Sequence, residues 1–301
     1  MAGVQGYRLF NVQLARKTEV SPSLLSLVFS GQEVAQMKCD SPDQRIKMLF
    51  PSEDGTPPSL PAEGHWYQLV LGMPKEKRPV IRTYTLRHVD PARQEVTVEF
   101  INHGTEGPAS AWAINARPGD AIQMVAPDAA YAEDSGGYEW TPPQGLRNAL
   151  IIADETALPA ARGILEMLAR QSNPPQVQAF FEVPEQGDCA NLSEFKFADI
   201  FWLPRNPAAA KHGECLIQAV KTHARVPESR HPDTVDTVDT VKEEAEGELL
   251  WDKATTSSTA FYGWVAAEST VVKLLRRHLI GERGVEHKAI NFMAYWSKGR
   301  A

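Results

Sequence analysis

The hydrophobic pattern of this 301-residue chain changes its period near residue 145, and that change limits the folds open to it. Before the change, short runs such as 95–101 (EVTVEFI) alternate apolar and polar residues, which is typical of half-buried antiparallel strands. After it, the continuous apolar run 149–153 (ALIIA) precedes a helical pattern over 157–170, which is typical of parallel strands joined by helices. We therefore expect two domains of different fold class.

The first domain is predicted over residues 1–134 as an antiparallel six-stranded barrel, because its short strand-like runs are separated by turn signals. The runs are 24–29, 45–50, 65–71, 82–87 and 95–101. The stretch 135–145, rich in glycine and proline, is the expected linker.

The second domain is predicted over residues 146–301 as an open parallel α/β sheet. Its expected strands are 149–153, 176–183, 197–203, 259–266 and 289–296, and its expected helices are 157–170, 214–225 and 268–281. Residues 227–248 interrupt this pattern with a repeated Asp-Thr-Val unit followed by glutamates. Low hydrophobicity and like charge predict a solvated, mobile insertion there.

Charge and composition exclude several classes of function. The formal net charge of −7 disfavours nucleic-acid binding, and no apolar run is long enough to insert in a membrane. Three cysteines, Cys39, Cys189 and Cys215, lie far apart without the spacing of a disulfide or metal site. We therefore expect a cytoplasmic protein with no resident metal.

The stretch 82–87 (RTYTLR) carries the clearest chemical signal. On a strand, Arg82 and Tyr84 share one face. A guanidinium can grip a phosphate and a phenol ring can pack on a flat heterocycle, so the pair suits a flavin nucleotide. The alternative is an edge strand with solvated arginines.

Two turns add weight to the flavin interpretation. Gly104 and Gly107 open a short helix whose first N–H groups could bind a pyrophosphate, although such turns also cap helices without any ligand. Asp154 and Glu155 follow a buried strand, where they could accept hydrogen bonds from a ribose or simply cap the next helix. No G-x-G-x-x-G motif accompanies them.

In order and spacing, several segments resemble the siderophore-interacting proteins, which are flavin-dependent ferric-siderophore reductases related to the ferredoxin reductases. The segments are 82–87, 103–112 (HGTEGPASAW), 116–120 (ARPGD), 154–160 (DETALPA), 264–268 (WVAAE) and 295–299 (YWSKG). The resemblance implies an FAD-binding β-barrel followed by an NAD(P)H-binding α/β domain.

The resemblance also implies roles for individual residues. Arg82 would meet the FAD pyrophosphate, Tyr84 would pack on the isoalloxazine, and Thr85 would lie near its redox-active edge, which makes Tyr84 and Thr85 the catalytic candidates. The full set of implied FAD-binding residues is Arg82, Thr83, Tyr84, Thr85, His103, Gly104, Gly107, Pro108, Ala109, Ser110, Asp154, Thr156 and Ala157. Candidate substrate contacts are Lys47, Lys298 and Arg300.

The implied activity is electron transfer from NAD(P)H through FAD to a ferric siderophore, with release of Fe(II) in the cytoplasm. Two alternatives stay open: a general NAD(P)H:flavin or quinone reductase, and a non-catalytic siderophore-binding protein of iron trafficking. The sequence does not identify the siderophore, and it does not distinguish NADH from NADPH or from a reduced protein as the electron donor.

Overall fold

A computed structural model of the chain describes residues 6–102, 104, 107–227 and 249–299. It divides into two compact units, Met1–Tyr138 and Glu139–Ala301. The division falls inside the 135–145 stretch that the sequence indicates as a linker. The predicted mobile insertion lies outside the described residues except for Pro227.

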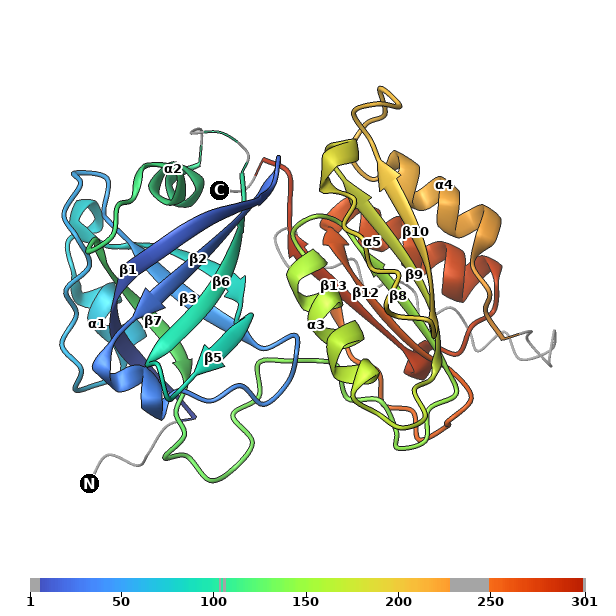
Figure 1. Cartoon of the computed structure of the whole chain (residues 1–301), viewed down its shortest axis with the longest axis horizontal. Helices are drawn as coiled ribbons and strands as arrows, with labels where there is room; N and C mark the ends of the chain where they lie inside the picture. The colour runs from blue at the N-terminus through green and yellow to red at the C-terminus, as the bar shows by residue number, and fades with distance from the viewer. Residues whose placement is uncertain (1–5, 103, 105–106, 228–248, 300–301) are drawn as a thin grey trace. The chain divides into compact units, whose positions relative to one another are not determined.

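The first unit is a curled antiparallel sheet of seven strands in the order β4-β3-β7-β1-β2-β6-β5 (Figure 1). The strands are β1 (Tyr7–Ser21), β2 (Leu24–Ser30), β3 (Arg45–Phe50), β4 (Val80–Thr85), β5 (His88–Asp90), β6 (Glu95–Ile101) and β7 (Ala121–Pro127). The predicted antiparallel β-domain is confirmed, but the predicted count of six strands is wrong. None of the strand-like runs identified in the sequence covers β1, β5 or β7, and the run 65–71 is a helix.

Aromatic side chains on alternate strand positions fill the interior of this unit. Helix α2 (Pro108–Asn115) closes over them, with Ala109 and Ala113 buried against the sheet. The Trp112 ring stacks on Phe29 at a centroid distance of 6.1 Å. It also meets Phe50 edge-on at 5.7 Å, centroid to centroid. These aromatic contacts of Trp112 fix the helix against the sheet.

The run 65–71, predicted as a strand, is a helix instead, α1 (Trp66–Gly72). Its apolar residues Trp66, Leu69, Val70 and Met73 recur at intervals of three or four, which is the helical period. They pack together in a small cluster that includes the buried Leu49 of β3. The helical period was therefore present in the sequence.

The second unit is a six-stranded sheet in the order β10-β9-β8-β12-β13-β11. The strands are β8 (Asn148–Ala153), β9 (Gln176–Val183), β10 (Ala198–Pro204), β11 (Trp251–Asp252), β12 (Tyr262–Glu268) and β13 (Ile290–Trp296). The first five strands in this order, β10 to β13, are parallel to one another, while the edge strand β11 runs antiparallel to β13. The sheet is therefore mixed, and the prediction of a wholly parallel sheet is wrong in that respect.

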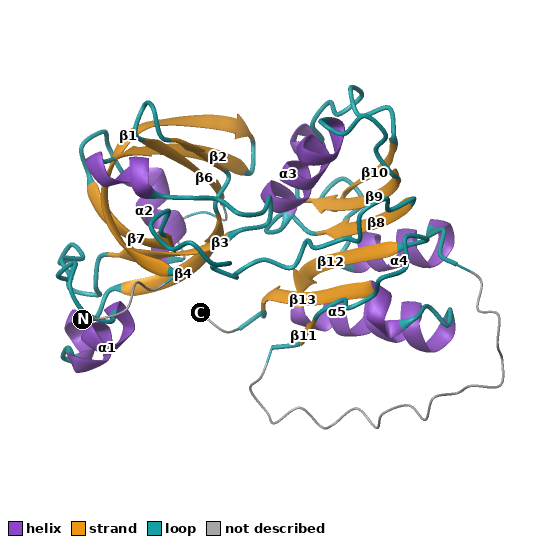
Figure 2. Ribbon diagram, turned by 90° about the horizontal axis from the view of Figure 1, so that it is seen from below, coloured by secondary structure: helices purple, strands orange, loops and turns teal. Residues whose placement is uncertain are grey.

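Helices cover both faces of this sheet (Figure 2). Helix α3 (Leu158–Ala169) packs on one face, and α4 (Glu214–His223) and α5 (Ser269–Arg276) pack on the other. Helix α5 continues as the π-helical stretch Arg277–Glu282. The short 3₁₀ helices of the chain are Gln32–Gln36, Lys75–Lys77, Gln186–Asp188 and His287–Ala289.

The strand order creates a switch point between β8 and β12. The chain leaves β8 through α3 on one face and leaves β12 through α5 on the other. In open α/β sheets a ligand binds at such a point, beside the carboxyl ends of the strands. Among the described residues, no helix is both long and apolar enough to cross a membrane.

Candidate functional site

Strand β4 presents Arg82 and Tyr84 on the face that meets the aromatic interior of the first unit. Arg82 lies opposite Met48 and Tyr84 opposite Ile46 in the antiparallel pair with β3. The Tyr84 ring lies 4.3 Å from the Phe100 ring, centroid to centroid. Burial raises the pKa of Tyr84, so the phenol stays neutral and its ring serves as a packing surface.

The opposite face of β4 carries Thr83 and Thr85, as alternation requires. Lys47 of β3 lies opposite Thr83, and its Nζ donates a hydrogen bond to Thr83 Oγ1 at 2.6 Å. Both side chains are exposed. Thr85 is buried and is the last residue of β4, so it lies where the strand ends.

The N-terminus of α2 is a candidate anion site. Gly107 is the N-cap residue, Pro108 occupies the first turn, and no side chain of the described residues caps the helix. Ser110 Oγ donates to the Gly104 carbonyl at 2.7 Å, and Gly104 has a φ of +77°, which favours glycine. The first N–H groups are therefore open to a phosphate. His103, with residues 105 and 106, lies outside the described residues.

One aromatic residue joins the strand to the helix. Phe50 meets Tyr84 at 6.2 Å and Trp112 at 5.7 Å, so β4 and α2 are fixed against the same ring. Arg82 Nη1 donates only to the adjacent Ile81 carbonyl, and no carboxylate of the described residues pairs with the guanidinium. A flat ring surface, an unpaired cation and an open helix terminus are the features that FAD requires, so the residues present fit this cofactor.

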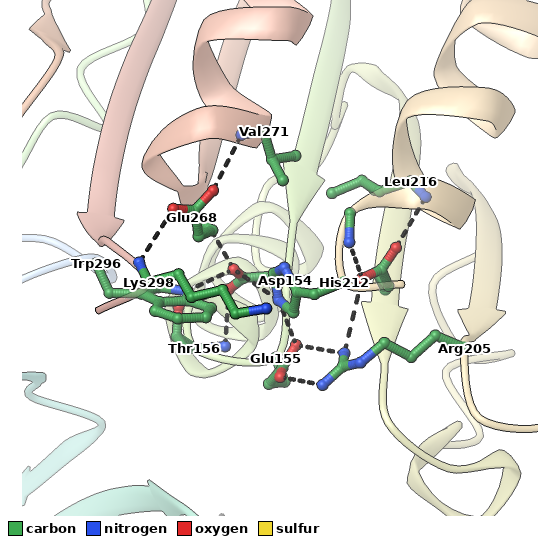
Figure 3. A network of polar contacts seen from close by, with 12 residues as sticks. Asp154, Glu155, Thr156, Arg205, His212, Leu216, Glu268, Val271, Trp296 and Lys298 are labelled. Carbon is green, nitrogen blue, oxygen red and sulfur yellow. Dashed lines mark hydrogen bonds and ion pairs between the residues drawn. The ribbon is translucent and has the colours of Figure 1, made fainter. Parts of the chain in front are cut away.

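The second unit has a buried carboxylate at its centre (Figure 3). Asp154 follows β8, is 0% exposed, and accepts hydrogen bonds from the backbone and hydroxyl of Thr156. It also accepts from the Glu268 backbone N–H and from Trp296 Nε1, each at 2.9 Å. This one side chain therefore ties together the carboxyl ends of β8, β12 and β13.

Glu268, at the end of β12, connects the start of α5 to the chain that follows β13. Its Oε2 accepts from the backbone N–H groups of Thr270 and Val271 and so caps α5, while Oε1 accepts from the Lys298 backbone at 3.2 Å. The Lys298 side chain itself is exposed, and Arg300 lies outside the described residues. The structure thus fixes the chain just after β13 against the switch point.

Beside Asp154, Glu155 forms a two-pronged ion pair with Arg205. Arg205 Nη2 and Nη1 lie 2.6 and 2.9 Å from the two carboxylate oxygens. His212 Nε2 lies 3.5 Å from both Asp154 and Glu155, and its ring meets the Trp296 ring edge-on. A buried pair of this geometry is held by charge-assisted hydrogen bonds.

This arrangement separates the pKa values of the two neighbouring carboxyl groups. Burial, together with the charge of Glu155, raises the pKa of Asp154 to about 6. Burial acts on Glu155 in the same direction, but His212 and the Arg205 fork outweigh it and lower the pKa of Glu155 to about 2. Burial likewise opposes protonation of His212, yet the surrounding carboxylates raise its pKa overall.

Atoms of Asp154, Glu155 and His212 lie within 4.8 Å of one another, a grouping that can hold a metal ion. Here, however, the Asp154 oxygens already accept from several protein donors, and both Glu155 oxygens are engaged by Arg205. We therefore interpret the grouping as an ion-pair network. Its carboxylates organise the protein and are not open to a ligand.

The structure groups the residues predicted from the sequence into two places. Arg82, Tyr84 and the Gly107 turn lie together in the first unit, while Asp154, Thr156 and the buried Ala157 form the turn after β8 in the second. Sequence reasoning missed Arg205 and His212, and it did not foresee the bond from Trp296 to Asp154. Arg205 directly follows a parallel strand, and that position is the signal that could have identified it.

A curled antiparallel sheet followed by an α/β sheet with a switch point is the ferredoxin-reductase-like fold. Comparison with known proteins gives the family. Residues 13–131 match the siderophore-interacting FAD-binding domain, and residues 146–299 match the siderophore-interacting protein model. The chain belongs to the siderophore-interacting protein family.

Two named relatives and one solved structure are similar over nearly the whole chain. The NADPH-dependent ferric-chelate reductase of Escherichia coli is 24% identical, covering 96% of this chain and 93% of its own. The ferric vibriobactin reductase ViuB of Vibrio cholerae is 26% identical, covering 96% and 89%. A siderophore utilization protein from T. fusca has a TM-score of 0.69 at 22% identity, covering 99% and 96%, and supports the fold.

Replacing Arg205 with methionine is expected to lower the free energy of unfolding by about 3 kcal/mol at pH 7, because it leaves the buried Glu155 charge unpaired. The folded-state pKa of Glu155 lies below its unfolded value. Its stabilising contribution is therefore present above about pH 4 and is lost as the pH falls toward about 2. Urea unfolding at pH 7 and at pH 3.5 should show the deficit shrinking at the lower pH.

Arg225→Met is the matched control. Arg225 pairs with Asp199 at 3.0 Å, but both side chains are more than half exposed, so the loss should stay below about 1 kcal/mol. A deficit for the Arg205 variant that is equally small, or that does not change with pH, would contradict the assigned role of the Arg205 pair.

Proposed function

We propose that this protein is an FAD-dependent reductase that takes electrons from NAD(P)H and delivers them to a ferric siderophore. Family membership supports the class of reaction, and the two relatives named as a ferric-chelate reductase and a ferric vibriobactin reductase support the kind of substrate. The observation in this chain that carries the proposal is Arg82, which pairs with no carboxylate among the described residues and lies beside Tyr84, on a core shared with the N-terminus of α2.

In this proposal FAD is held by the first unit. Arg82 and the backbone of residues 107–110 bind its pyrophosphate, while Tyr84 offers a ring surface to the isoalloxazine. Thr85, at the end of β4, lies near the reacting edge, and Gly104 completes the lining, while Thr83 lies on the other face of the strand beside Lys47. Bound FAD supplies the redox chemistry, accepting a hydride and giving up single electrons.

The second unit supplies the nucleotide side of the reaction. The turn after β8 carries Asp154, Thr156 and Ala157, and its position at the switch point supports a role in binding a nucleotide. Because the Asp154 carboxylate is occupied by protein donors, we assign it the role of shaping this turn, and we assign the ligand contacts to exposed groups and the backbone.

The substrate is a ferric chelate, and Lys47 and Lys298 are the exposed cations that we assign to its attraction. Hard oxygen chelators hold Fe(II) far less tightly than Fe(III), so one-electron reduction frees the iron. No protein nucleophile is needed. We place the reaction in the cytoplasm, because a reducing compartment keeps the three free thiols of Cys39, Cys189 and Cys215 reduced.

Arg82→Gln is expected to weaken FAD binding by about ten- to a hundredfold, because charge-assisted hydrogen bonds to a phosphate contribute about 1.5–3 kcal/mol. Titration of flavin-free protein with FAD, followed by fluorescence, measures this. Arg93→Gln, an exposed arginine between β5 and β6, is the control and should bind FAD normally. Equal affinities for the two variants would remove Arg82 from the site.

Steady-state assays with the FAD-loaded protein test the function itself. NADH or NADPH is supplied with a ferric tris-catecholate, free flavin or a quinone, and Fe(II) is trapped by a chromogenic chelator. The proposal predicts a kcat/KM for the ferric chelate at least tenfold above those for flavin and quinone. Higher values for flavin or quinone would indicate a general reductase, and tight chelate binding without turnover would indicate a binding protein. Turnover only with a reduced ferredoxin would indicate a protein donor.

A further inference from the structure

The choice between NADH and NADPH is open in the proposed function, and the turn after β9 bears on it. In a doubly wound sheet, the strand next to the first one ends beside the adenosine ribose of a bound dinucleotide. An acidic residue there accepts a hydrogen bond from the 2′-hydroxyl of NADH, whereas an arginine there accommodates the 2′-phosphate of NADPH. In this sheet the first strand is β8. The next strand along the chain is β9, which pairs with β8 in parallel, so the turn after β9 is the one expected beside the ribose.

The residues after β9 form a rigid acidic turn. Glu185 and Asp188 cap each other: the Glu185 side chain accepts from the Asp188 backbone, and the Asp188 side chain accepts from the Glu185 N–H at 2.9 Å. Asn206, from the neighbouring turn after β10, donates to Glu185 Oε1 at 2.5 Å. The Glu185 carboxylate is thus fixed in place while remaining partly exposed.

The arginine that could bind a 2′-phosphate at this edge is already committed. Arg205 gives two N–H groups to Glu155, which is 2% exposed, and its Nη1 lies 3.7 Å from Glu182 (Figure 3). Turning Arg205 toward a phosphate would leave the buried Glu155 without its partner, which is strongly unfavourable.

The remaining charges at this edge also oppose a second phosphate. Residues 184–189 and 205–213 carry the acids Glu185 and Asp188, and their cations are Lys211, together with Arg205 and His212, which face the buried acids Asp154 and Glu155. The Lys211 backbone N–H is bound by the Glu214 carboxylate at 2.9 Å, which places a further negative charge beside it. A 2′-phosphate carries nearly two negative charges and would meet these acids at close range.

We infer that this protein uses NADH in preference to NADPH, and that Glu185 is the residue that excludes the 2′-phosphate. The inference rests on the proposed use of a nicotinamide nucleotide. Glu185 acts in two ways: its charge repels the phosphate, and its free lone pairs accept a hydrogen bond from the ribose hydroxyl. The named Escherichia coli relative uses NADPH, so this chain differs from it in donor.

Anaerobic reduction of the FAD-loaded, full-length protein by each nucleotide tests the inference. NADH should show a kcat/KM at least tenfold above that of NADPH. Glu185→Gln keeps the shape and an acceptor for Asn206 but removes the charge, so it should narrow the NADH:NADPH ratio several-fold, chiefly through a lower KM for NADPH. Glu194→Gln, an exposed acid of the loop that leads into β10, is the matched control and should leave the ratio unchanged.

A second measurement needs no variant. In competition with NADH, 5′-ADP should inhibit the wild-type protein at lower concentration than 2′,5′-ADP does. The inference is wrong if NADPH is used as well as NADH, if Glu185→Gln leaves the ratio unchanged, or if Lys211→Gln selectively impairs NADPH use. Reduction by dithionite but by neither nucleotide would instead remove the nucleotide from the proposed function, and the inference with it.

Discussion

The second unit depends on a carboxylate that never meets solvent. Asp154 collects hydrogen bonds from its own turn, from the end of β12 and from the indole of Trp296, so three strand ends are held in one arrangement. A buried carboxyl group is stable only when it is well bonded, and that condition makes the arrangement specific. The positions of the Glu268 cap, the Lys298 backbone and the His212 ring all follow from it.

In the first unit an aromatic cluster, not a buried carboxylate, holds separate elements together. Phe50 lies between the Tyr84 ring and the Trp112 ring, so the strand that carries Arg82 and the helix that begins at Gly107 share one support. Groups that must meet one ligand from distant parts of the sequence need a common rigid element behind them. Here that element is an aromatic cluster, because stacked and edge-on rings fix both distance and orientation.

Much of this could be predicted from the sequence, where period and local chemistry agree. The apolar run 149–153 and the alternating run 95–101 were correctly predicted as strands, and the glycine turn at Gly104 and Gly107 was correctly predicted to open a helix. The run 65–71 was predicted as a strand, although its apolar residues have helical spacing. Arg205 directly follows a strand and could have been found from that position, but His212 could not, since only the folded sheet brings it beside Asp154 and Glu155.

The central claim is that a ferric chelate draws its electrons from FAD held by this chain. The most direct test is a single turnover without oxygen: the FAD-loaded protein is reduced with one equivalent of NADH and then mixed with a ferric tris-catecholate. The account predicts that the visible flavin absorbance returns rapidly, in step with the formation of Fe(II). A flavin that stays reduced in the presence of the chelate, yet reoxidises at once with a quinone, would contradict it.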